Sequence, residues 1–377
     1  MTKALKMTKS KILWSLFCVI IFAFLFRVYL VHESKNKEIP GKTRTVTDMK
    51  DRTFEVKDPI NRIALLGGPT GQIAFILGIQ DRLCAVTNTL KMSPLVREMY
   101  LKIKDLPGPR TTSGSINIEE LIRSNPDIAV AGDIDGNIVL EKTRIPVAFL
   151  SDSMGEGLVD IKKEVLFYGY LFNAKDRAEK YVKFLDRVTG LVRQRTKDIP
   201  KDAKKTVFQG YNPSHLVTLG GDTFMQEHIE LAGCLNAAET ITTLGAQTGL
   251  HSGLGEVSME QVLDWNPDIL VINYGTSDDL YTDPQWNKIK AVQDQQIFFQ
   301  PAGIFIFNRP TAESAVIFPL WLASTAYPDR FQDLCINCIV KEFYKEILGF
   351  DLNDDQVRGI LLGTYELKMM KGISHKG

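Results

Sequence analysis

An internal repeat is the feature of this sequence that most constrains its fold. Residues 117–130 align without a gap on residues 258–271, and both segments contain Asn-Pro-Asp-Ile. In each copy an amphipathic helical pattern ends before the proline, because the residue before a proline disfavours helical backbone, and a buried apolar strand follows. A helix–strand unit used twice predicts two similarly built α/β lobes with a cleft between them.

The rest of the chain supports this architecture. Apolar segments at residues 62–66, 83–86 and 147–150 alternate with helical patterns, as in a parallel α/β sheet. Residues 174–198 between the halves read as one helix, about 37 Å long at ~1.5 Å per residue. One face of that helix is apolar and carries Ala178, Tyr181, Leu185, Val188 and Val192. A single rigid rod between the lobes predicts a small, stiff closure.

The N-terminal segment has the pattern of an export signal. Four lysines precede the apolar residues 12–26, but no small-x-small cleavage site follows them. Bulky Leu16 and Phe17 argue against lipoprotein processing at Cys18. If the Arg27 side chain extends to the membrane–water interface, residues 12–31 are about long enough to span a bilayer. We expect an uncleaved anchor, with a cleaved signal as the alternative, and a periplasmic or otherwise extracytoplasmic globular part.

Composition excludes several kinds of partner. Lysine plus arginine equals aspartate plus glutamate at 45 each, so no net field favours nucleic acid.

Of the five cysteines, only Cys335 and Cys338 are close in sequence. They lack a second pair for zinc and do not open the first helix after a strand, so a local disulfide or two incidental thiols is expected. Cys84 and Cys234 lie in apolar segments typical of the core.

No catalytic or cofactor motif is present. The glycine-rich segment 67–71 lacks the lysine of a phosphate loop, and residues 253–255 lack the third glycine of a dinucleotide fingerprint. No Gly-x-Ser-x-Gly elbow occurs. With only five histidines, a bare-metal site is a poor interpretation. We expect neither enzymatic activity nor a resident cofactor or metal.

Several segments, in order and spacing, resemble the type III substrate-binding proteins of ABC importers. This family includes receptors for iron–siderophores, haem and cobalamin, and some oxyanion and nickel-complex receptors. The matching pieces are an opening hairpin at 45–62, the two repeats at 117–127 and 258–260, and segments 219–237, 286–297 and 319–331. Asp51 stands where the family usually has glycine. The resemblance implies two Rossmann-like parallel-sheet lobes. The expected domains are a signal or anchor (1–35), an N-terminal lobe (36–172), a linker helix (173–198) and a C-terminal lobe (199–377).

The resemblance also implies contacts with a permease. In the family a glutamate at the tip of each lobe docks onto permease arginines, and the matching positions are Glu119 and Glu260. Both positions also belong to the repeat. The alternative is that each glutamate only stabilises the N-terminus of its helix through the macrodipole.

Ligands of open α/β sheets bind beyond the carboxyl ends of the strands, and this rule selects the candidate ligand residues. Arg309 is the first choice, because a guanidinium forks onto carboxylate, catecholate or oxyanion oxygens; an ion pair supporting the next helix is the alternative. Tyr211 and Tyr274 are candidates to stack on a chelate, donate to it or ligate iron, and Phe305 and Phe307 suggest an apolar wall. The rule also selects Thr70 and Asn88. Arg110 and His251 are further candidates in loops that could reach the cleft, although the rule does not place them.

The function predicted from these residues is the extracytoplasmic substrate-binding component of an ABC importer. It would be a monomer that carries a metal chelate, foremost a ferric siderophore, to a permease and its ATPase. The apolar wall favours a chelate, because a small oxyanion such as molybdate or tungstate needs hydroxyls and amides instead. Haem, cobalamin and a nickel complex remain alternatives, as do an anchored sensor and an extracytoplasmic enzyme.

Overall fold

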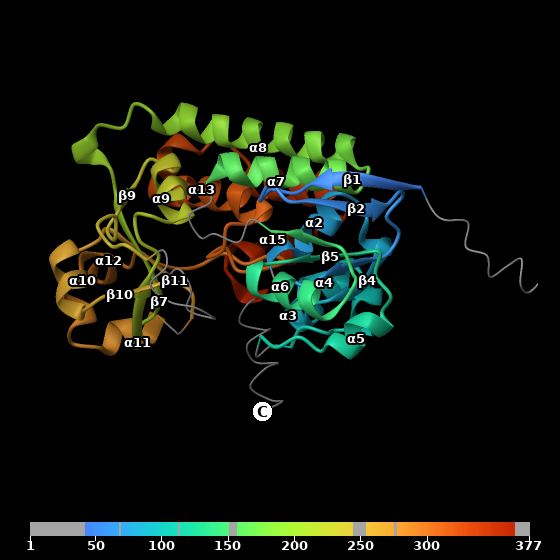
Figure 1. Ribbon diagram of the computed structural model, residues 1–377. Coiled ribbons are helices and arrows are strands. Elements are labelled where there is room, and N and C mark those ends of the chain that lie inside the picture. The colour runs from blue at the N-terminus through green and yellow to red at the C-terminus, as the bar shows by residue number, and fades with distance from the viewer. Residues whose placement is uncertain are drawn as a thin grey trace, which may run out of the picture. The chain divides into compact units, whose positions relative to one another are not determined.

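The computed structural model describes residues 42–67, 69–111, 114–150, 157–243, 254–274 and 277–365. The predicted signal or anchor segment lies outside these ranges. Within them, no helix combines the length and apolarity needed to cross a membrane. The architecture is α/β, with two separate sheets that each contain parallel strands (Figure 1).

The first sheet has four parallel strands in the order β4-β3-β5-β6. All residues of these strands are buried, as expected of parallel strands covered on both faces. The opening hairpin forms a separate two-stranded sheet, as predicted. The strands are β1 (Thr43–Thr47), β2 (Thr53–Lys57), β3 (Ile63–Leu65), β4 (Leu83–Val86), β5 (Ile128–Ala131) and β6 (Val147–Phe149).

Short helical segments connect these strands, and a longer helix follows the last of them. In chain order they are η1 (Pro69–Gln72), α2 (Ile73–Ile76), η2 (Gln80–Arg82), α3 (Asn88–Met92), α4 (Pro94–Met99), η3 (Leu101–Asp105), α5 (Ile118–Arg123), α6 (Asp133–Lys142) and α7 (Leu158–Leu171).

The second sheet runs β10-β8-β7-β11-β12, with β9 also paired to β7. Strands β7, β9, β11 and β12 are parallel, whereas β8 pairs antiparallel with both β7 and β10. The strands are β7 (Thr206–Asn212), β8 (His215–Thr218), β9 (Leu235–Asn236), β10 (Gly255–Glu256), β11 (Ile269–Ile272) and β12 (Ile297–Phe299). The helical segments are η4 (Lys201–Ala203), α9 (Phe224–Leu231), α10 (Met259–Trp265), α11 (Ser277–Thr282), η6 (Trp286–Lys288), α12 (Lys290–Gln293), α13 (Ala312–Ala326), η7 (Pro328–Arg330), α14 (Ile336–Phe343), the π-helical η8 (Tyr344–Leu348) and α15 (Asp354–Leu361).

A long helix, α8 (Lys175–Thr196), occupies the segment predicted as the linker. Its predicted apolar face is confirmed, since all five of the residues named for it are buried. The helix packs on α7 and α13, and the Tyr181 hydroxyl donates to the carbonyl of Ala312 at 2.9 Å. Arg177 donates to the carbonyl of Ile76 at 3.1 Å and also to that of Ile347. The helix is thus tied to α2, α13 and η8; the rigidity of the connection stays a prediction.

The two copies of the repeat fold alike. Asn117 caps α5 by accepting from the amide of Glu120 at 3.1 Å, and Ser258 caps α10 by accepting from the amide of Gln261 at 3.2 Å. Asn125 and Asn266 then take left-handed backbone with φ of 46° and 38°, a conformation that asparagine tolerates and that ends a helix. Each helix therefore stops where the repeat predicts.

The aspartate of the repeat joins two strands in each lobe. Asp127 accepts from the amide of Arg62 at 3.0 Å through its carboxylate, and its own amide donates to the Arg62 carbonyl at 2.8 Å. Asp268 makes the same pair with Thr206, at 2.9 and 2.8 Å. Lysines complete the pattern, because Lys57 lies 2.9 Å from Asp127 and Lys290 also pairs with Asp268. The aspartates thereby anchor the starts of β3 and β7 to β5 and β11.

These aspartates predict a loss of stability in acid. Burial alone would raise the pKa of Asp127 and of Asp268, but the lysine and backbone donors outweigh it and lower both pKa values. The stability that the carboxylates contribute is therefore present above the unfolded-state pKa, about 3.9, and is lost as the pH falls through the lowered folded-state pKa. Replacing either aspartate by asparagine should lower the free energy of unfolding at pH 7 by about 1–3 kcal/mol.

Urea denaturation at pH 7 and pH 3 measures this effect. Both variants should lose less stability than the parent between the two pH values. Asp264→Asn, an exposed position on α10, is the matched control and should follow the parent. Parent-like stability of both variants at pH 7 would contradict the anchoring role.

Candidate functional site

Two of the predicted ligand residues meet at the carboxyl edge of the second sheet. Tyr211 lies near the end of β7, and Tyr274 follows the neighbouring strand β11. Their ring centroids are 4.9 Å apart with an edge-to-face angle of 65°, and the amide of Tyr274 donates to the Tyr211 carbonyl at 3.0 Å. Both side chains are half-buried. The register of two parallel strands thus creates a paired aromatic and hydroxyl-bearing surface from residues distant in sequence.

Buried side-chain amides precede both tyrosines in sequence: Gln209 lies two residues before Tyr211, and Asn273 directly before Tyr274. Gln209 donates through its side chain to the side-chain oxygen of Asn273 at 2.9 Å, and both residues are at most 3% exposed. Register places Asn273 beside Gln300, the residue after β12. Gln209 Oε1, Asn273 Nδ2 and both polar atoms of Gln300 have no hydrogen-bond partner within the described part of the protein. These amides were not predicted from the sequence; the only local signal is that Asn273 and Gln300 directly follow the apolar strands β11 and β12, whereas Gln209 lies within β7.

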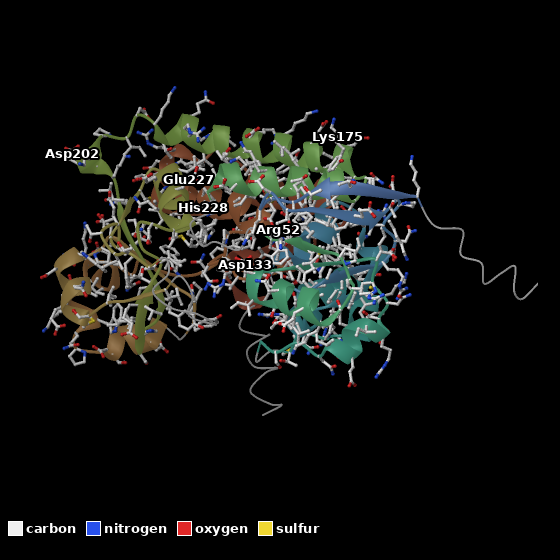
Figure 2. The ribbon with its side chains drawn as sticks, viewed as in Figure 1. Arg52, Asp133, Lys175, Asp202, Glu227 and His228 are labelled. Atoms are coloured by element: carbon white, nitrogen blue, oxygen red, sulfur yellow. A yellow bond between two sulfur atoms is a disulfide. The ribbon has the colours of Figure 1, made fainter. Side chains whose placement is uncertain are left out.

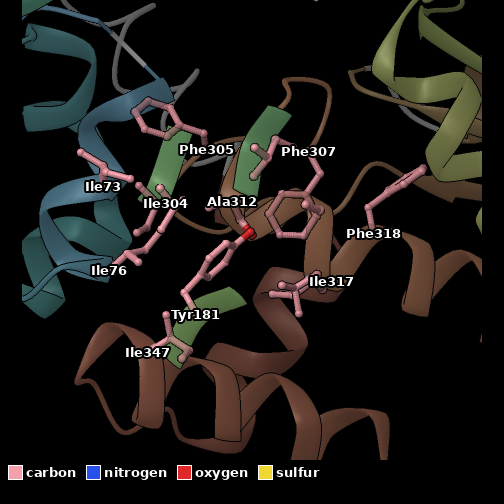
Figure 3. Close-up of a cluster of buried hydrophobic side chains, with 14 of the residues drawn as sticks. Ile73, Ile76, Tyr181, Ile304, Phe305, Phe307, Ala312, Ile317, Phe318 and Ile347 are labelled. Carbon is pink, nitrogen blue, oxygen red and sulfur yellow. The ribbon is translucent and has the colours of Figure 1, made fainter. Parts of the chain in front are cut away.

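The segment after β12 carries Arg309 but turns its two phenylalanines inward. Arg309 is half-buried and donates to the carbonyl of Asn308 at 3.1 Å, and the hydroxyl of Ser314 holds the Arg309 carbonyl at 2.8 Å. Phe305 is 8% exposed and Phe307 is fully buried. Both pack in the main hydrophobic cluster (Figure 3), which also includes α2, α8 and α13 side chains. Their surroundings here are those of core residues, so a ligand wall remains only a prediction for them.

Glu313, the second residue of α13, is a fully buried carboxyl group that the sequence analysis also missed. It accepts from the hydroxyl of Tyr344 and from the amide of Ile304 at 3.0 Å. Burial raises its pKa to about 7, although these donors oppose the shift. A Cβ on Gly303 would lie 1.8 Å from a Glu313 oxygen, so glycine is required there. The carboxyl group thereby fixes the course of residues 303–305.

This carboxyl lies within a network that reaches the first half of the chain. The amide of Glu313 donates to the side-chain oxygen of Gln72, in η1, at 2.9 Å. The hydroxyl of Ser93 donates to the carbonyl of Ile304 at 3.1 Å. The segment that carries Arg309 is therefore held from both halves of the molecule.

At the carboxyl edge of the first sheet, the charged side chains are paired with one another. The backbone N–H of Asn88 donates to the Arg110 carbonyl at 3.2 Å, and the Arg110 side chain forms an ion pair with Asp135 of α6. Arg52 lies 3.1 Å above the ring of Phe149, the last residue of β6. Lys50 also pairs with Asp133 on this side of the lobe, and Figure 2 labels Arg52 and Asp133 there. His251 and the side chain of Thr70 lie outside the described residues.

The two glutamates predicted to dock on a permease occupy equivalent places. Glu119 and Glu260 are both exposed and both stand second in their helices, α5 and α10. Isolated bridges join Ile116 to Arg110 and Arg110 to Thr87, which places the start of α5 beside the carboxyl end of β4. The pairing of β10 with β8, and of β8 with the end of β7, does the same for α10. Each glutamate thus lies toward the carboxyl edge of its own sheet.

Nothing in the described ranges groups three or more histidine, cysteine or acidic side chains as a metal site would require. His228 of α9 is fully buried against Phe224 and Phe318, and burial lowers its pKa to about 3. It is therefore a neutral core residue.

Comparison with known proteins agrees with this geometry. A family model described as periplasmic binding protein matches residues 63–302. The molybdate-binding protein MolA of Haemophilus influenzae is 26% identical over 336 residues, which cover 80% of this chain and 90% of MolA. The structure of MolA bound to molybdate superposes with a TM-score of 0.69 at 23% identity, covering 82% of this chain and 99% of MolA.

Two further solved structures share the fold. A periplasmic solute-binding protein from Veillonella parvula has a TM-score of 0.72 at 22% identity, over 87% of this chain and 98% of its own. Helicobacter pylori CeuE in complex with nickel and histidine has a TM-score of 0.67 at 20% identity, over 84% and 98%. The matched family consists of substrate-binding transport proteins, not enzymes. This chain belongs to the periplasmic binding protein family of ABC importers.

Proposed function

We propose that this protein captures a metal oxyanion of the molybdate or tungstate type outside the cytoplasm and passes it to an ABC permease and its ATPase. The observation that carries this choice is the burial of Phe305 and Phe307 in the core. The apolar wall was the reason to favour a chelate over an oxyanion, and these two side chains are packed inside the protein. The molybdate bound by the relative MolA supports the same ligand class.

The groups at the sheet edges suit such a ligand. An oxyanion is held by hydroxyls, amides and guanidinium groups that donate charge-assisted hydrogen bonds. The proposal assigns this role to the hydroxyls of Tyr211 and Tyr274 and to the guanidinium of Arg309. The hydrogen bond between Gln209 and Asn273, which precede the two tyrosines in sequence, would hold strands β7 and β11 in register.

A ferric chelate is the second candidate, and the tyrosine pair supports it. Two phenolic oxygens on adjacent strands are hard ligands of the kind that ferric iron accepts. In that version Tyr211 and Tyr274 would complete the coordination of an iron–siderophore complex, and Arg309 would neutralise its carboxylate or catecholate groups.

Calorimetric titration of residues 36–377 separates the two candidates. The panel consists of molybdate, tungstate, sulfate, a ferric catecholate, haem, cobalamin and nickel–histidine. We expect tight binding of molybdate and tungstate, and weaker binding of sulfate. Saturable binding of a ferric chelate with no response to oxyanions would establish the second candidate instead. Failure of every compound would refute both.

Variants then assign the site. Arg309→Ala should weaken oxyanion binding at least ~10-fold, because a charged hydrogen bond contributes roughly 1.5–3 kcal/mol. Tyr211→Phe and Tyr274→Phe remove only a hydroxyl and should each weaken binding several-fold. Tyr281→Phe is the matched control, since Tyr281 is 37% exposed on α11, and it should bind like the parent. Unchanged affinity in all three site variants would place the ligand elsewhere.

A further inference from the structure

One disulfide lies apart from the proposed ligand residues. Cys335 and Cys338, three positions apart in sequence, are bonded to each other, and both are exposed. Cys335 is the N-cap of α14, and its sulfur accepts from the amide of Cys338 at 3.2 Å. The bond therefore sits at the solvent-facing N-terminus of a helix.

The other two described cysteines have the opposite environment. Cys84 and Cys234 are buried, and burial raises the pKa of their thiols to about 11 and about 12. Neither forms appreciable thiolate near neutral pH, so neither can compete in thiol chemistry. Among the cysteines that the structure describes, exchange with an external thiol is thereby directed to the Cys335–Cys338 bond.

A purely structural role explains this bond poorly. In the chain-entropy view a disulfide stabilises mainly by closing a long loop in the unfolded chain, and this one closes the short loop from residue 335 to 338. Helix α14 is also held without it. Its own residues Ile339, Val340 and Phe343 are buried, and its Lys341 pairs with Asp354 at 2.7 Å.

The surroundings favour Cys335 as the sulfur that leaves as thiolate. The amide of Cys338 and the positive end of the helix stabilise an anion at the N-cap position. The first turn of α14 contains no acidic residue. The nearby carboxylate of Asp333 is occupied by a two-pronged contact with Arg195, at 2.6 and 2.8 Å. Little negative charge therefore opposes a thiolate on Cys335.

We propose that Cys335–Cys338 is a thiol–disulfide exchange site that accepts two electrons from an extracytoplasmic dithiol. A thiolate of the dithiol attacks the sulfur of Cys338, forms a mixed disulfide and expels Cys335 as thiolate. The second thiolate of the partner then attacks the partner sulfur that is bonded to Cys338, which forms the partner's disulfide and releases Cys338 as thiolate. The partner ends as a disulfide and this protein as a dithiol, and the two protons of the partner pass to the released sulfurs or to solvent.

Alkylation of the full-length protein tests the proposal. The folded, oxidised protein is exposed to dithiothreitol and then to a maleimide, and the labelled cysteines are identified by mass. We expect both Cys335 and Cys338 to be labelled while Cys84 and Cys234 are not, with the denaturant midpoint nearly unchanged by reduction. A bond that dithiothreitol reduces only after unfolding, or whose reduction unfolds the protein, would establish a structural staple and overturn the proposal.

A second measurement tests the assignment of the leaving sulfur. Cys338→Ser leaves Cys335 as a single thiol, and Cys335→Ser leaves Cys338. The alkylation rate of Cys335 should reach half its maximum well below pH 8.5, the ordinary value for a thiol, and at pH 6 should exceed that of Cys338 at least ~10-fold. Equal rates with an ordinary midpoint for both would refute the thiolate role of Cys335.

Discussion

Simultaneous replacement of Glu119 and Glu260 by arginine is expected to abolish import while leaving ligand affinity unchanged. Both glutamates are exposed at the second position of equivalent helices, toward the sheet edges where the proposed ligand residues lie. A permease that bound this side of the protein would contact one acidic side chain from each lobe. Placing arginine against arginine replaces attraction by like-charge repulsion, which costs several kcal/mol.

Transport of the bound ligand into cells or vesicles containing the permease measures the effect. The double variant should fall at least ~10-fold, and each single variant should fall less. Glu141→Arg is the control, because Glu141 is exposed near the end of α6, away from the start of that helix at the sheet edge. Lost import with intact affinity indicates docking. Retained import would leave the glutamates with only their helix-terminal role, and lost affinity would place them in the ligand site.

Glu313→Gln is expected to remove a loss of stability that the parent shows between pH 5 and pH 8. Burial raises the folded-state pKa of Glu313 from 4.5 to about 7. The stability linked to the neutral acid is fully present below the unfolded-state pKa. It is lost as the pH rises through about 7, because the unfolded chain ionises first. The shift corresponds to roughly 3 kcal/mol at 1.36 kcal/mol per pKa unit.

Denaturant unfolding at several pH values tests this, with the difference between variant and parent as the readout. Ile304 and Tyr344 donate to different oxygens of Glu313. Glutamine keeps one oxygen to accept from the Ile304 amide, and its NH₂ group can donate to the Tyr344 hydroxyl oxygen, so the fold should be retained. The variant should gain on the parent from pH 5 to about pH 7, and the difference should level off towards pH 8, where both states are ionised. Glu342→Gln removes the carboxylate of an exposed ion pair with Arg187 and should keep the parent's pH profile. A constant difference between Glu313→Gln and the parent would show that Glu313 does not titrate in this range.

Much of the architecture was predictable because it depends on local rules. The Asn-Pro-Asp repeats predicted two helix ends and two buried strands, since proline restricts the residue before it and a continuous apolar run is typical of a covered parallel strand. The apolar face of α8 followed from helical periodicity. The resemblance to a transport family rests on many short segments in the right order, and the match over residues 63–302 confirms it.

Side-chain direction near the strand ends was not predictable in the same way. The edge rule placed Phe305 and Phe307 near the ligand, yet they pack inward with α2 and α8. A rule about where a segment lies does not say which way its side chains turn. Residues from the other half of the chain decided that, as Gln72 and Ser93 hold the segment through Glu313 and Ile304.

By itself the sequence determined where the helices of the repeat end and several buried strands lie, that two similar lobes form, and which glutamates are equivalent. These features follow from periodicity, capping and proline, which act within a few residues. Only the tertiary structure decided that Tyr211 meets Tyr274, that Gln209 pairs with Asn273, and that Glu313 is a buried acid. Such pairs depend on strand register and on contacts between segments tens to hundreds of residues apart, and no local pattern encodes those distances.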